Sequence, residues 1–430
     1  MKRIPINQVK LEEECKISGW VKNFRDKKYM IFIVLKDLSG EIQVSIEKET
    51  NPELVEKLKG VIPHSVISVY GKAIASEYCK LGGREFIPTD IKVDSLAEAL
   101  PITKEASVDQ KMDYRWIDLR EPEKTLIFQV ATCLEKAMRE YCLNNSFIEI
   151  HTPKISGQST EGGSEVFKIE YFDTTAYLTQ SPQFYKQMAM SSGFERVFEF
   201  GDCFRAEKSF TSRHATEFES FDIEMSYVDS HHDVMDLEEE LLCYALKVVN
   251  EEYGEKIKEV FGVEVKVPTV KFPRISYHEA LKILKEEFNY VGANNDFDTE
   301  SERLMCQYAL KKFGSEFVFI TEYPFNQRAF YSMKCDDNRE LSKSYDLLWK
   351  DVEITSGAQR EHRPTELRQN IAEKGINPDN MQFYIDFFRY GCPAHGGFAI
   401  GMARLVAKLL NLSSIKESTF IFRGPTRLLP

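Results

Sequence analysis

A chain of 430 residues with 43% hydrophobic and 29% charged residues is typical of a soluble globular protein with room for two domains. No apolar run is long enough to span a membrane, the N-terminus lacks a signal-peptide core, and the nine cysteines include no CxxC pair, so we expect a cytoplasmic protein without a zinc site or a disulfide framework. The net charge of −12 argues against a nucleic-acid-binding protein but does not exclude one, because a basic track along one face is enough to bind RNA.

Residues 1–100 are predicted to form a small all-β domain. Five short alternating runs between Cys15 and Asp94 are separated by turn residues, and a short helix is expected at 52–60. Five strands in so short a segment favour an OB-fold barrel, although another small β module would fit the same pattern.

One face of this barrel has the residue types of a single-strand RNA site. Phe32 and Gln43 fall on neighbouring strands, and a basic cluster that includes Arg25 precedes them. An aromatic ring stacks on a base, and an amide hydrogen-bonds to a base edge. Phe32 taken alone is better explained as a core residue, so the residues by themselves leave both interpretations open.

The rest of the chain is predicted to be one larger domain, at 125–430, reached through a hinge at 101–124. The hinge is polar and charged, and Leu126–Asn145 then shows the apolar spacing of an amphipathic helix. Residues 230–332 alternate between helical and strand patterns without a chemical constellation, and we interpret them as a peripheral insertion.

The segment Phe198–Val228 has the pattern of a β-hairpin with one charged face. That face carries an arginine, three carboxylates, a hydroxyl and an aromatic ring: Arg205, Glu207, Phe218, Ser220, Asp222 and Glu224. A charged, aromatic floor suits an anionic and planar ligand, and ATP is the obvious candidate. The plainer alternative is a solvated hairpin with chance charge pairing.

A second chemical centre is predicted between Ser344 and His362. Strand alternation would place Glu353 and Thr355 on one face, ahead of a turn. Three residues of this segment, Asp346, Glu353 and Ser356, offer only oxygen ligands, which suits a hard cation such as Mg²⁺. A chance cluster is an equally good explanation from these residues alone.

Three motifs together resemble those of the class II aminoacyl-tRNA synthetases. Phe147–Ile155 is similar to motif 1, Phe204–Glu207 with the residues up to Phe218 to motif 2, and Gly396–Leu405 to motif 3. Their order and separations make the resemblance specific, and it covers nearly the whole chain. It is closest to the aspartyl enzymes of the archaeal and eukaryotic type, within subclass b.

The resemblance implies an α+β catalytic domain built on an antiparallel sheet, preceded by the OB-fold barrel, and a homodimer. The implied activity is ATP-dependent ligation of L-aspartate to tRNA(Asp) through an aspartyl-adenylate, with Mg²⁺ on the phosphates. Neither step needs a protein nucleophile, because the site aligns reactants and offsets charge.

The resemblance also assigns residues. Arg205, Glu207 and Arg404 would be catalytic. ATP would be bound by Arg205, Glu207, Arg213, His214, Phe218, Glu353 and Arg404. Aspartate would be bound by Glu161, Ser181, Gln183, Lys186, Asp222, Ser356, Gly357 and Arg360. The metal would be held by Asp346, Glu353 and Ser356, and the anticodon by Arg25, Phe32 and Gln43.

Plainer interpretations stay open for two of these assignments. A lone helical lysine such as Lys186 is usually solvated, and the glycine-rich segment around Glu161 fits an ordinary surface loop as well as a lid. Two rival functions are an asparaginyl-tRNA synthetase and a non-catalytic RNA-binding paralogue. Lys186 and Arg360 argue against the first, because two cations suit a carboxylate and not a carboxamide.

The sequence leaves the range of tRNA substrates open. Lys22 occupies a barrel position where strict archaeal enzymes carry tryptophan, which favours charging of tRNA(Asn) as well. Three residues depart from the pattern of the family at and after motif 3: Ala399, Ala403 and Gly424.

Overall fold

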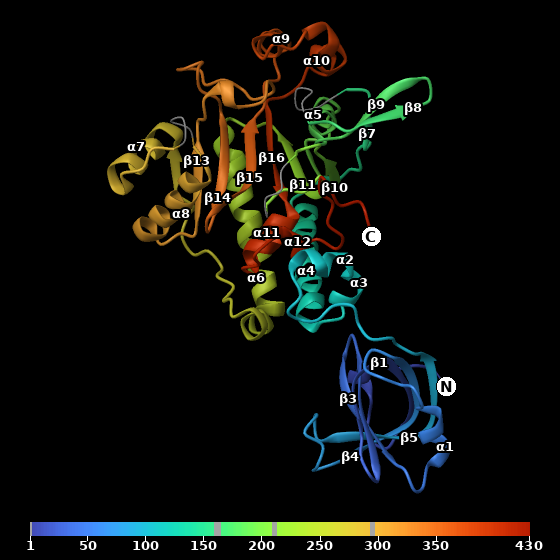
Figure 1. The fold of residues 1–430 in the computed structure, drawn as a ribbon. Helices are drawn as coiled ribbons and strands as arrows, with labels where there is room; N and C mark the ends of the chain where they lie inside the picture. Colours follow the sequence, from blue (N-terminus) through green and yellow to red (C-terminus); the bar gives the residue numbers. More distant parts are fainter. Residues whose placement is uncertain (1, 159–164, 209–212, 293–296) are drawn as a thin grey trace. The chain divides into compact units, whose positions relative to one another are not determined.

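The computed structural model describes residues 2–158, 165–208, 213–292 and 297–430 (Figure 1). The chain divides into two compact units, Met1–Lys104 and Glu105–Pro430. Of the helices in the described ranges, none combines the length and the apolar character needed to cross a membrane.

The first unit is a closed barrel with the strand order β1-β2-β3-β5-β4. Its elements are η1 (Ile6–Gln8), β1 (Glu14–Asp26), β2 (Met30–Asp37), β3 (Gly40–Glu47), α1 (Pro52–Lys57), β4 (Val66–Ala75) and β5 (Arg84–Ser95). In β2 every second residue is buried, as a barrel with one packed face requires. Gly71, at φ +150°, lies at a register irregularity in β4 where a Cβ would be 2.1 Å from the Ile87 carbonyl oxygen. The predicted OB-fold barrel is confirmed.

The second unit is built on a mixed sheet. Its order in the described residues is β12-β13-β14-β15-β16-β11-β10-β6, antiparallel except at the β12–β13 and β10–β6 pairs. The strands are β6 (Ile148–Glu149), β10 (Arg196–Phe204), β11 (Glu217–Ser226), β12 (Arg274–Ser276), β13 (Phe317–Thr321), β14 (Ser344–Trp349), β15 (Val352–Gln359) and β16 (His395–Gly401). A smaller sheet consists of β7 (Ile155–Ser156), β8 (Lys168–Tyr171) and β9 (Thr174–Leu178).

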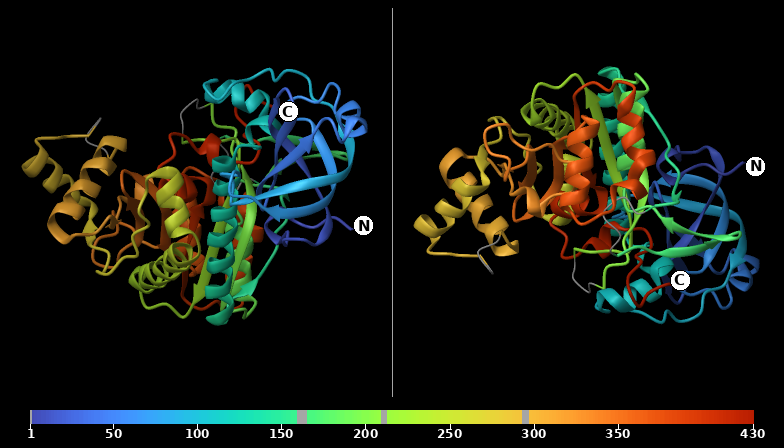
Figure 2. Two further views of the ribbon diagram at one scale, coloured as in Figure 1. Left: turned by 90° about the horizontal axis from the view of Figure 1, so that it is seen from below. Right: turned by 90° about the horizontal axis from the view of Figure 1, so that it is seen from above.

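Helices surround this sheet (Figure 2). They are α2 (Val108–Asp113), α3 (Arg115–Asp118), α4 (Pro122–Asn144), α5 (Gln183–Ser191), α6 (His231–Phe261), α7 (Tyr277–Phe288), α8 (Thr299–Phe313), η3 (Phe325–Gln327), α9 (Pro364–Glu373), η4 (Pro378–Met381), α10 (Gln382–Arg389), α11 (Met402–Leu409) and α12 (Ile415–Ser418). The long helices α4 and α6 pack side by side against one face of the sheet, where they form the largest hydrophobic core.

Alternation along β11 assigns the two faces of the sheet. Phe221 and Ile223 belong to the core beneath α4 and α6, whereas Ser220 and Asp222 line a cavity on the other side. The functional site therefore occupies the sheet face that α4 and α6 leave uncovered.

Two predicted boundaries differ from the structure. Helix α6, which begins after the capping residue Ser230 and ends at Gly262 in the left-handed conformation, packs in the main core and not in a peripheral insertion. Within the predicted insertion, α7 and α8 form a separate small core with β12 to β14. Most of the predicted hinge belongs to the second unit, where the buried Arg115 donates hydrogen bonds to the carbonyls of Thr419 and Phe420.

Candidate functional site

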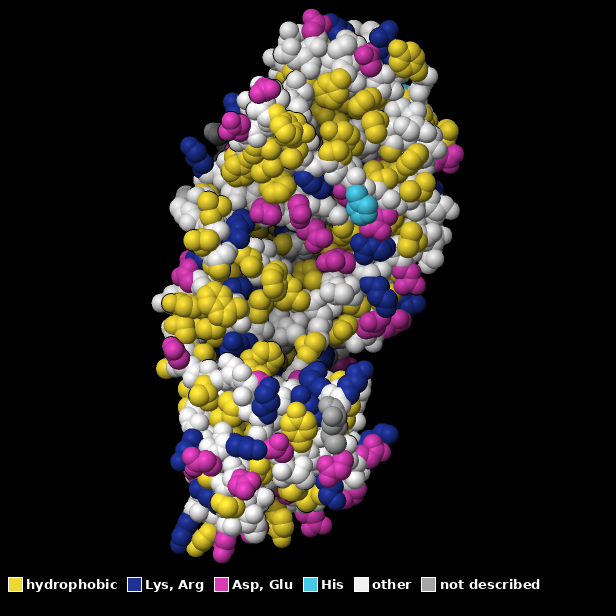
Figure 3. Space-filling model, turned by 90° about the vertical axis from the view of Figure 1, so that its right-hand side faces the viewer, with side chains coloured by type: hydrophobic (Ala, Val, Ile, Leu, Met, Phe, Trp, Pro, Cys, Tyr) yellow, Lys and Arg dark blue, Asp and Glu magenta, His cyan; other side chains and the backbone are white. Residues whose placement is uncertain are grey.

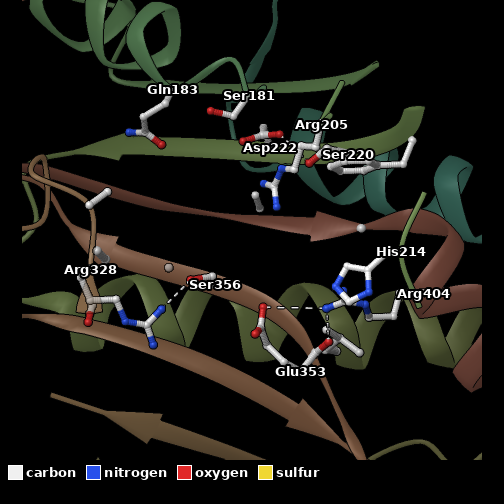
Figure 4. A pocket seen from close by; sticks show the side chains of 18 of the residues that line it. Ser181, Gln183, Arg205, His214, Ser220, Asp222, Arg328, Glu353, Ser356 and Arg404 are labelled. Carbon is white, nitrogen blue, oxygen red and sulfur yellow. Dashed lines mark hydrogen bonds and ion pairs between the residues drawn. The ribbon is translucent and has the colours of Figure 1, made fainter. Parts of the chain in front are cut away.

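A polar cavity of about 390 Å³ opens over β11, β15 and β16. Figure 4 shows its lining, in which side chains from the hairpin, from α5 and from β15 point toward one another. We call the part around Lys186, Asp222, Glu224 and Arg360 the closed end. The part around Arg205, Glu207, His214 and Phe218 is the open end.

The hairpin β10–β11 positions the open end, although its outgoing strand is shorter than predicted. β10 ends at Phe204, so Arg205 and Glu207 lie beyond the ladder, and the predicted strand alternation there is wrong. The backbone N–H of Arg205 still donates to the carbonyl of Thr216 at 2.9 Å, which holds the two chains together past the last ladder pair.

At the open end, three charged or protonatable side chains lie beside an aromatic ring. The Arg205 guanidinium lies 5.2 Å from the centre of the Phe218 ring. Glu207 is 3.9 Å from Arg205 and 3.8 Å from His214, and all of these side chains are partly exposed. A planar, anionic ligand would find a stacking surface and two loosely held cationic or protonatable groups here.

The C-terminal motif contributes Arg404 from α11. Its Nη1 donates to the backbone carbonyl of Glu353 at 2.7 Å, and both side chains line the cavity. Glu302 of α8, which sequence reasoning missed, accepts the Glu353 N–H at 3.2 Å and lies 3.7 Å from Arg213. No sequence signal pointed to Glu302, because it lies in a region without a chemical pattern.

The closed end is a buried network of two cations and two carboxylates. Lys186 Nζ donates to Asp222 at 3.0 Å and lies 3.3 Å from Glu224. Arg360 Nε donates to Glu224 at 3.0 Å, and Ser220 Oγ donates to Asp222 at 2.7 Å. Burial alone raises the pKa of Glu224, but Arg360 and Lys186 outweigh it and hold that pKa below its ordinary value.

This network corrects one step of the sequence argument. The sequence predicts that Lys186 and Arg360 suit a carboxylate substrate, because a carboxamide beside a spare buried ammonium would leave charge unmatched. In the structure Glu224 pairs with both of them and Asp222 pairs with Lys186. Charge counting from the sequence missed Glu224, although its place in the β11 alternation was the available signal.

A second layer of hydrogen bonds, also missed, supports Gln183 at the closed end. Gln183 Nε2 donates to Gln187 Oε1 at 2.8 Å, and the Tyr384 hydroxyl donates to the same oxygen at 2.6 Å. His395 Nδ1 must donate to the Pro393 carbonyl, so its Nε2 accepts from the Gln187 amide at 2.9 Å. Burial lowers the pKa of His395 to about 4, which keeps the ring neutral.

The predicted metal ligands lie on β14 and β15, and we call this group the metal corner. Asp346 is directly opposite Ser356 in the strand register, and Glu353 and Ser356 line the cavity. The prediction that Glu353 and Thr355 share a face is wrong: the register shifts by one residue between Leu347 and Leu348, so a bulge in β15 turns Glu353 and Ser356 to the cavity.

The donor set of the metal corner fits a hard cation. Two carboxylates and a hydroxyl offer only oxygen. Burial and the charge of Asp346 raise the pKa of Glu353 to about 7. A bound dication would offset the repulsion between these two carboxylates. No group of three or more His, Cys, Asp or Glu side chains in the described residues is arranged for a metal, so the serine is needed as the third donor.

An arginine side chain occupies the metal corner, and the sequence analysis did not predict it. Arg328, which follows η3, donates to both carboxylate oxygens of Asp346 at 2.9 and 2.5 Å. It also donates to Ser356 Oγ at 3.1 Å (Figure 4). Arg328 lies in an irregular segment without periodicity, so nothing in the sequence singled it out.

The remaining predicted aspartate ligands are placed as follows. Ser181 and Gly357 line the cavity, and a Cβ at Gly357 would lie 2.4 Å from the Tyr345 ring, so only glycine fits there. Glu161 lies outside the described residues.

In the barrel, the three predicted anticodon residues meet on the outer face of β1, β2 and β3. Arg25 Nη2 donates to Gln43 Oε1 at 3.3 Å, and its guanidinium lies 5.7 Å from the centre of the Phe32 ring. Phe32 is half-buried and not part of the barrel core. Lys22 pairs with Glu41 at 2.6 Å on the same face.

The departures in and after motif 3 are accommodated locally. Ala399 lines the cavity on β16, opposite Asp222. Ala403 packs against the cluster that contains the buried Phe422. A Cβ at Gly424 would lie 2.8 Å from the Phe422 ring, so the glycine makes room for that ring. Arg404 keeps its place in the cavity.

Comparison with known proteins agrees with this architecture. Residues 15–94 match the family described as OB-fold nucleic acid binding domain. An aspartate–tRNA(Asp) ligase of Pyrococcus abyssi is 41% identical, over 97% of this chain and 96% of that protein. An aspartate–tRNA(Asp/Asn) ligase of Aeropyrum pernix is 39% identical, over 96% and 95%. A solved asparaginyl-tRNA synthetase of Pyrococcus horikoshii, complexed with asparaginyl-adenylate, is 31% identical with a TM-score of 0.91 over all of both chains.

Residues 107–422 match the family described as tRNA synthetases class II (D, K and N). This match covers most of the chain and includes all three motifs, the cavity and both of its ends. The chain therefore belongs to the class II tRNA synthetases of the D, K and N group.

Proposed function

We propose that the protein is an ATP-dependent aspartate–tRNA ligase. The observation that carries this proposal is the buried ammonium of Lys186, which lies beside Arg360 at the closed end of the cavity. The names of the relatives from Pyrococcus abyssi and Aeropyrum pernix support it.

The proposed selectivity for aspartate follows from the ion pairs at the closed end. Asp222 is the predicted partner of the substrate α-ammonium, and in the structure it accepts a hydrogen bond from Lys186. When Asp222 engages the ammonium, the side-chain carboxylate of aspartate replaces its charge beside Lys186. Asparagine supplies the ammonium but no compensating anion, so Lys186 would keep only Glu224, which it shares with Arg360, in a dry site.

In the first step, the aspartate α-carboxylate attacks the α-phosphorus of ATP, and pyrophosphate leaves. Arg205 faces the charge that develops on the α-phosphate, while Phe218 stacks on the adenine ring and Glu207 accepts from its amino group. His214, Arg213 and Arg404 hold the outer phosphates. These residues position the reactants and offset charge, and none forms a covalent bond.

Asp346, Glu353 and Ser356 would hold Mg²⁺ at the metal corner. When bound, the metal would neutralise phosphate charge and orient the pyrophosphate leaving group. In the second step, the terminal hydroxyl of the tRNA attacks the adenylate carbonyl and AMP leaves, so the open end must admit the tRNA end as well as ATP.

The barrel would bind the anticodon through Arg25, Phe32 and Gln43. Its preformed contacts between a guanidinium, a ring and an amide match the needs of one unstacked base. Lys22 and the Aeropyrum relative favour tRNA(Asn) as a second acceptor. The high structural similarity to an asparaginyl-tRNA synthetase makes that enzyme the second candidate function.

We propose the homodimer that the resemblance implies, through the helix at 126–145 and motif 1, whose last residue, Ile155, begins the small sheet. The small sheet exposes Ile155, Tyr171 and Phe172 at 46%, 43% and 85%. Hydrophobic side chains gather on the face of the second unit that carries this sheet (Figure 3). Sedimentation of the wild type against Phe172→Asp would test the dimer, with a shift to monomer expected.

One experiment tests the proposed function directly: aminoacylation of purified tRNA(Asp) and tRNA(Asn) with labelled aspartate and labelled asparagine. We expect aspartate on tRNA(Asp) and asparagine on neither tRNA. Asparagine on tRNA(Asn) would replace the proposal with the asparaginyl enzyme, and no charging at all would favour a non-catalytic RNA-binding protein.

A further inference from the structure

Arg328 occupies the oxygen atoms that the metal corner would offer to a cation. Its two terminal nitrogens donate to both carboxylate oxygens of Asp346, and one of them also donates to Ser356 Oγ. Asp346 and Ser356 are neighbours across β14 and β15, so a single guanidinium blocks two of the three proposed ligands.

This arginine is held firmly in place. Its guanidinium stacks 3.7 Å from the centre of the Tyr323 ring, and its side chain is 15% exposed. Burial alone lowers the pKa of Arg328, but Asp346 outweighs burial and keeps the group charged. Nε has no hydrogen-bond partner among the described residues, and the two Nη atoms donate to Asp346 and Ser356 of the metal corner.

The same lone pairs cannot serve two cations. A guanidinium hydrogen-bonded to both oxygens of Asp346 takes two of the roughly four lone-pair sites of that carboxylate, and a metal on the remaining sites would lie beside a buried positive group that repels it. The state with Arg328 and the state with the metal therefore compete at the metal corner.

We propose that Arg328 is an internal counter-cation of the metal corner, which the metal must displace, so that metal binding is weak until nucleotide is present. The inference rests on the proposed metal site and adds an order of binding to it. The anionic triphosphate supplies the charge that allows Arg328 to leave Asp346 while the metal takes its place. Arg328 is a positioning residue in this account.

Binding of Mn²⁺ to the full-length protein without nucleotide tests the inference, with free Mn²⁺ followed by electron paramagnetic resonance. Arg328→Met keeps an apolar chain against Tyr323 and removes the charge. We expect it to bind Mn²⁺ at least about tenfold more tightly than the wild type. We also expect Mn²⁺ to raise the thermal midpoint of Arg328→Met more than that of the wild type, because the metal replaces a lost partner of a buried carboxylate.

Arg328→Lys is the second variant, because it keeps the charge but loses the planar fork that covers both oxygens. We expect a smaller gain in Mn²⁺ affinity than for Arg328→Met. Asp346→Asn, measured with ATP present, reports on the metal site itself and should weaken Mn²⁺ binding.

The outcomes separate the two claims. Equal nucleotide-free Mn²⁺ affinity in wild type, Arg328→Met and Arg328→Lys, together with weakened binding in Asp346→Asn, would overturn the inference alone. Unchanged Mn²⁺ binding in Asp346→Asn would overturn the metal site and the inference with it. Neither result decides the proposed function, which the aminoacylation experiment tests separately.

Discussion

The charged side chains at the two ends of the cavity differ in burial and in the distances to their partners. At the closed end, the side chains of Lys186, Asp222 and Glu224 are at most 3% exposed and are paired at 3.0 to 3.3 Å. At the open end, the side chains of Arg205 and His214 are 43% and 41% exposed, and both lie almost 4 Å from Glu207. Charges at the closed end are matched inside the protein, whereas those at the open end are partly exposed to solvent and lie farther apart.

The difference separates selection from catalysis. A substrate that enters the closed end must replace existing pairs in a dry environment, so a mismatch of one charge is costly. A phosphate at the open end displaces water from loosely held groups, and it gains most where charge develops during the reaction. We therefore expect substitutions at the closed end to change substrate preference and those at the open end to change rate.

The largest effect is expected at the open end. Arg205→Ala removes the donor facing the α-phosphate, and should lower ATP–pyrophosphate exchange with aspartate by roughly a hundredfold or more. The matched control is Arg139→Ala, since Arg139 also lies over a ring, Phe200 at 4.7 Å, but does not line the cavity. Wild-type exchange in the Arg205 variant would show that the open end is misassigned.

At the closed end, preference should change more than rate. Lys186→Leu removes one of the two cations, and the ratio of aspartate to asparagine activation should fall by more than about tenfold. Lys154→Leu is the control, because Lys154 also pairs with a buried carboxylate, that of Glu199 at 2.7 Å, outside the cavity. A ratio that stays constant while both substrates are activated more slowly would mean that Lys186 has only a structural role.

Sequence periodicity was sufficient for the parts of the molecule that are regular. Burial alternates strictly along β2 of the barrel, and β11 placed Asp222 on the cavity side as alternation requires. It failed at Glu353, because a bulge in β15 adds one residue that no pattern revealed. Arg205 was placed at the cavity correctly although the strand ends before it.

The sequence analysis did not predict the charged partners that come from distant parts of the chain. Glu302 contacts Glu353 and Arg213 from α8, and Arg328 reaches the cavity from an irregular segment, and neither has a periodic neighbour to mark it. The pairing of Glu224 with two cations required knowledge of which strands lie side by side. A predicted list of cations is therefore incomplete until their carboxylate partners are known.

A substitution in the barrel should leave both ends of the cavity intact. Phe32→Ala removes a stacking surface worth about 1–3 kcal/mol per base, or at least about fivefold in tRNA affinity. Aspartate activation without tRNA should be unchanged, and aminoacylation should weaken through the apparent KM for tRNA. Tyr29→Ala is the control, as an exposed aromatic on the same unit. Normal tRNA charging by the Phe32 variant would contradict the anticodon assignment.

The smallest effect on activity, and a separate effect on stability, is expected behind the closed end. Glu238 of α6 is fully buried and accepts a hydrogen bond from the Tyr345 hydroxyl at 2.8 Å. Burial raises the pKa of Glu238 to about 8. Between the ordinary carboxyl pKa and pH 8 the folded protein therefore keeps a proton that the unfolded chain releases, so this residue makes stability fall as pH rises through that window.

Glu238→Gln keeps an acceptor for Tyr345 and removes the titration. Thermal midpoints measured between pH 5.5 and 8 should fall less steeply for Glu238→Gln than for the wild type, whereas Glu251→Gln, an exposed site on the same helix, should follow the wild type. Exchange rates at pH 7.5 should be close to normal, because Glu238 lies on the sheet face opposite the cavity. Parallel midpoint curves for wild type and Glu238→Gln would mean that Glu238 ionises in the folded protein as it does in the unfolded chain, and that the hydrogen bond from Tyr345 is made to a carboxylate.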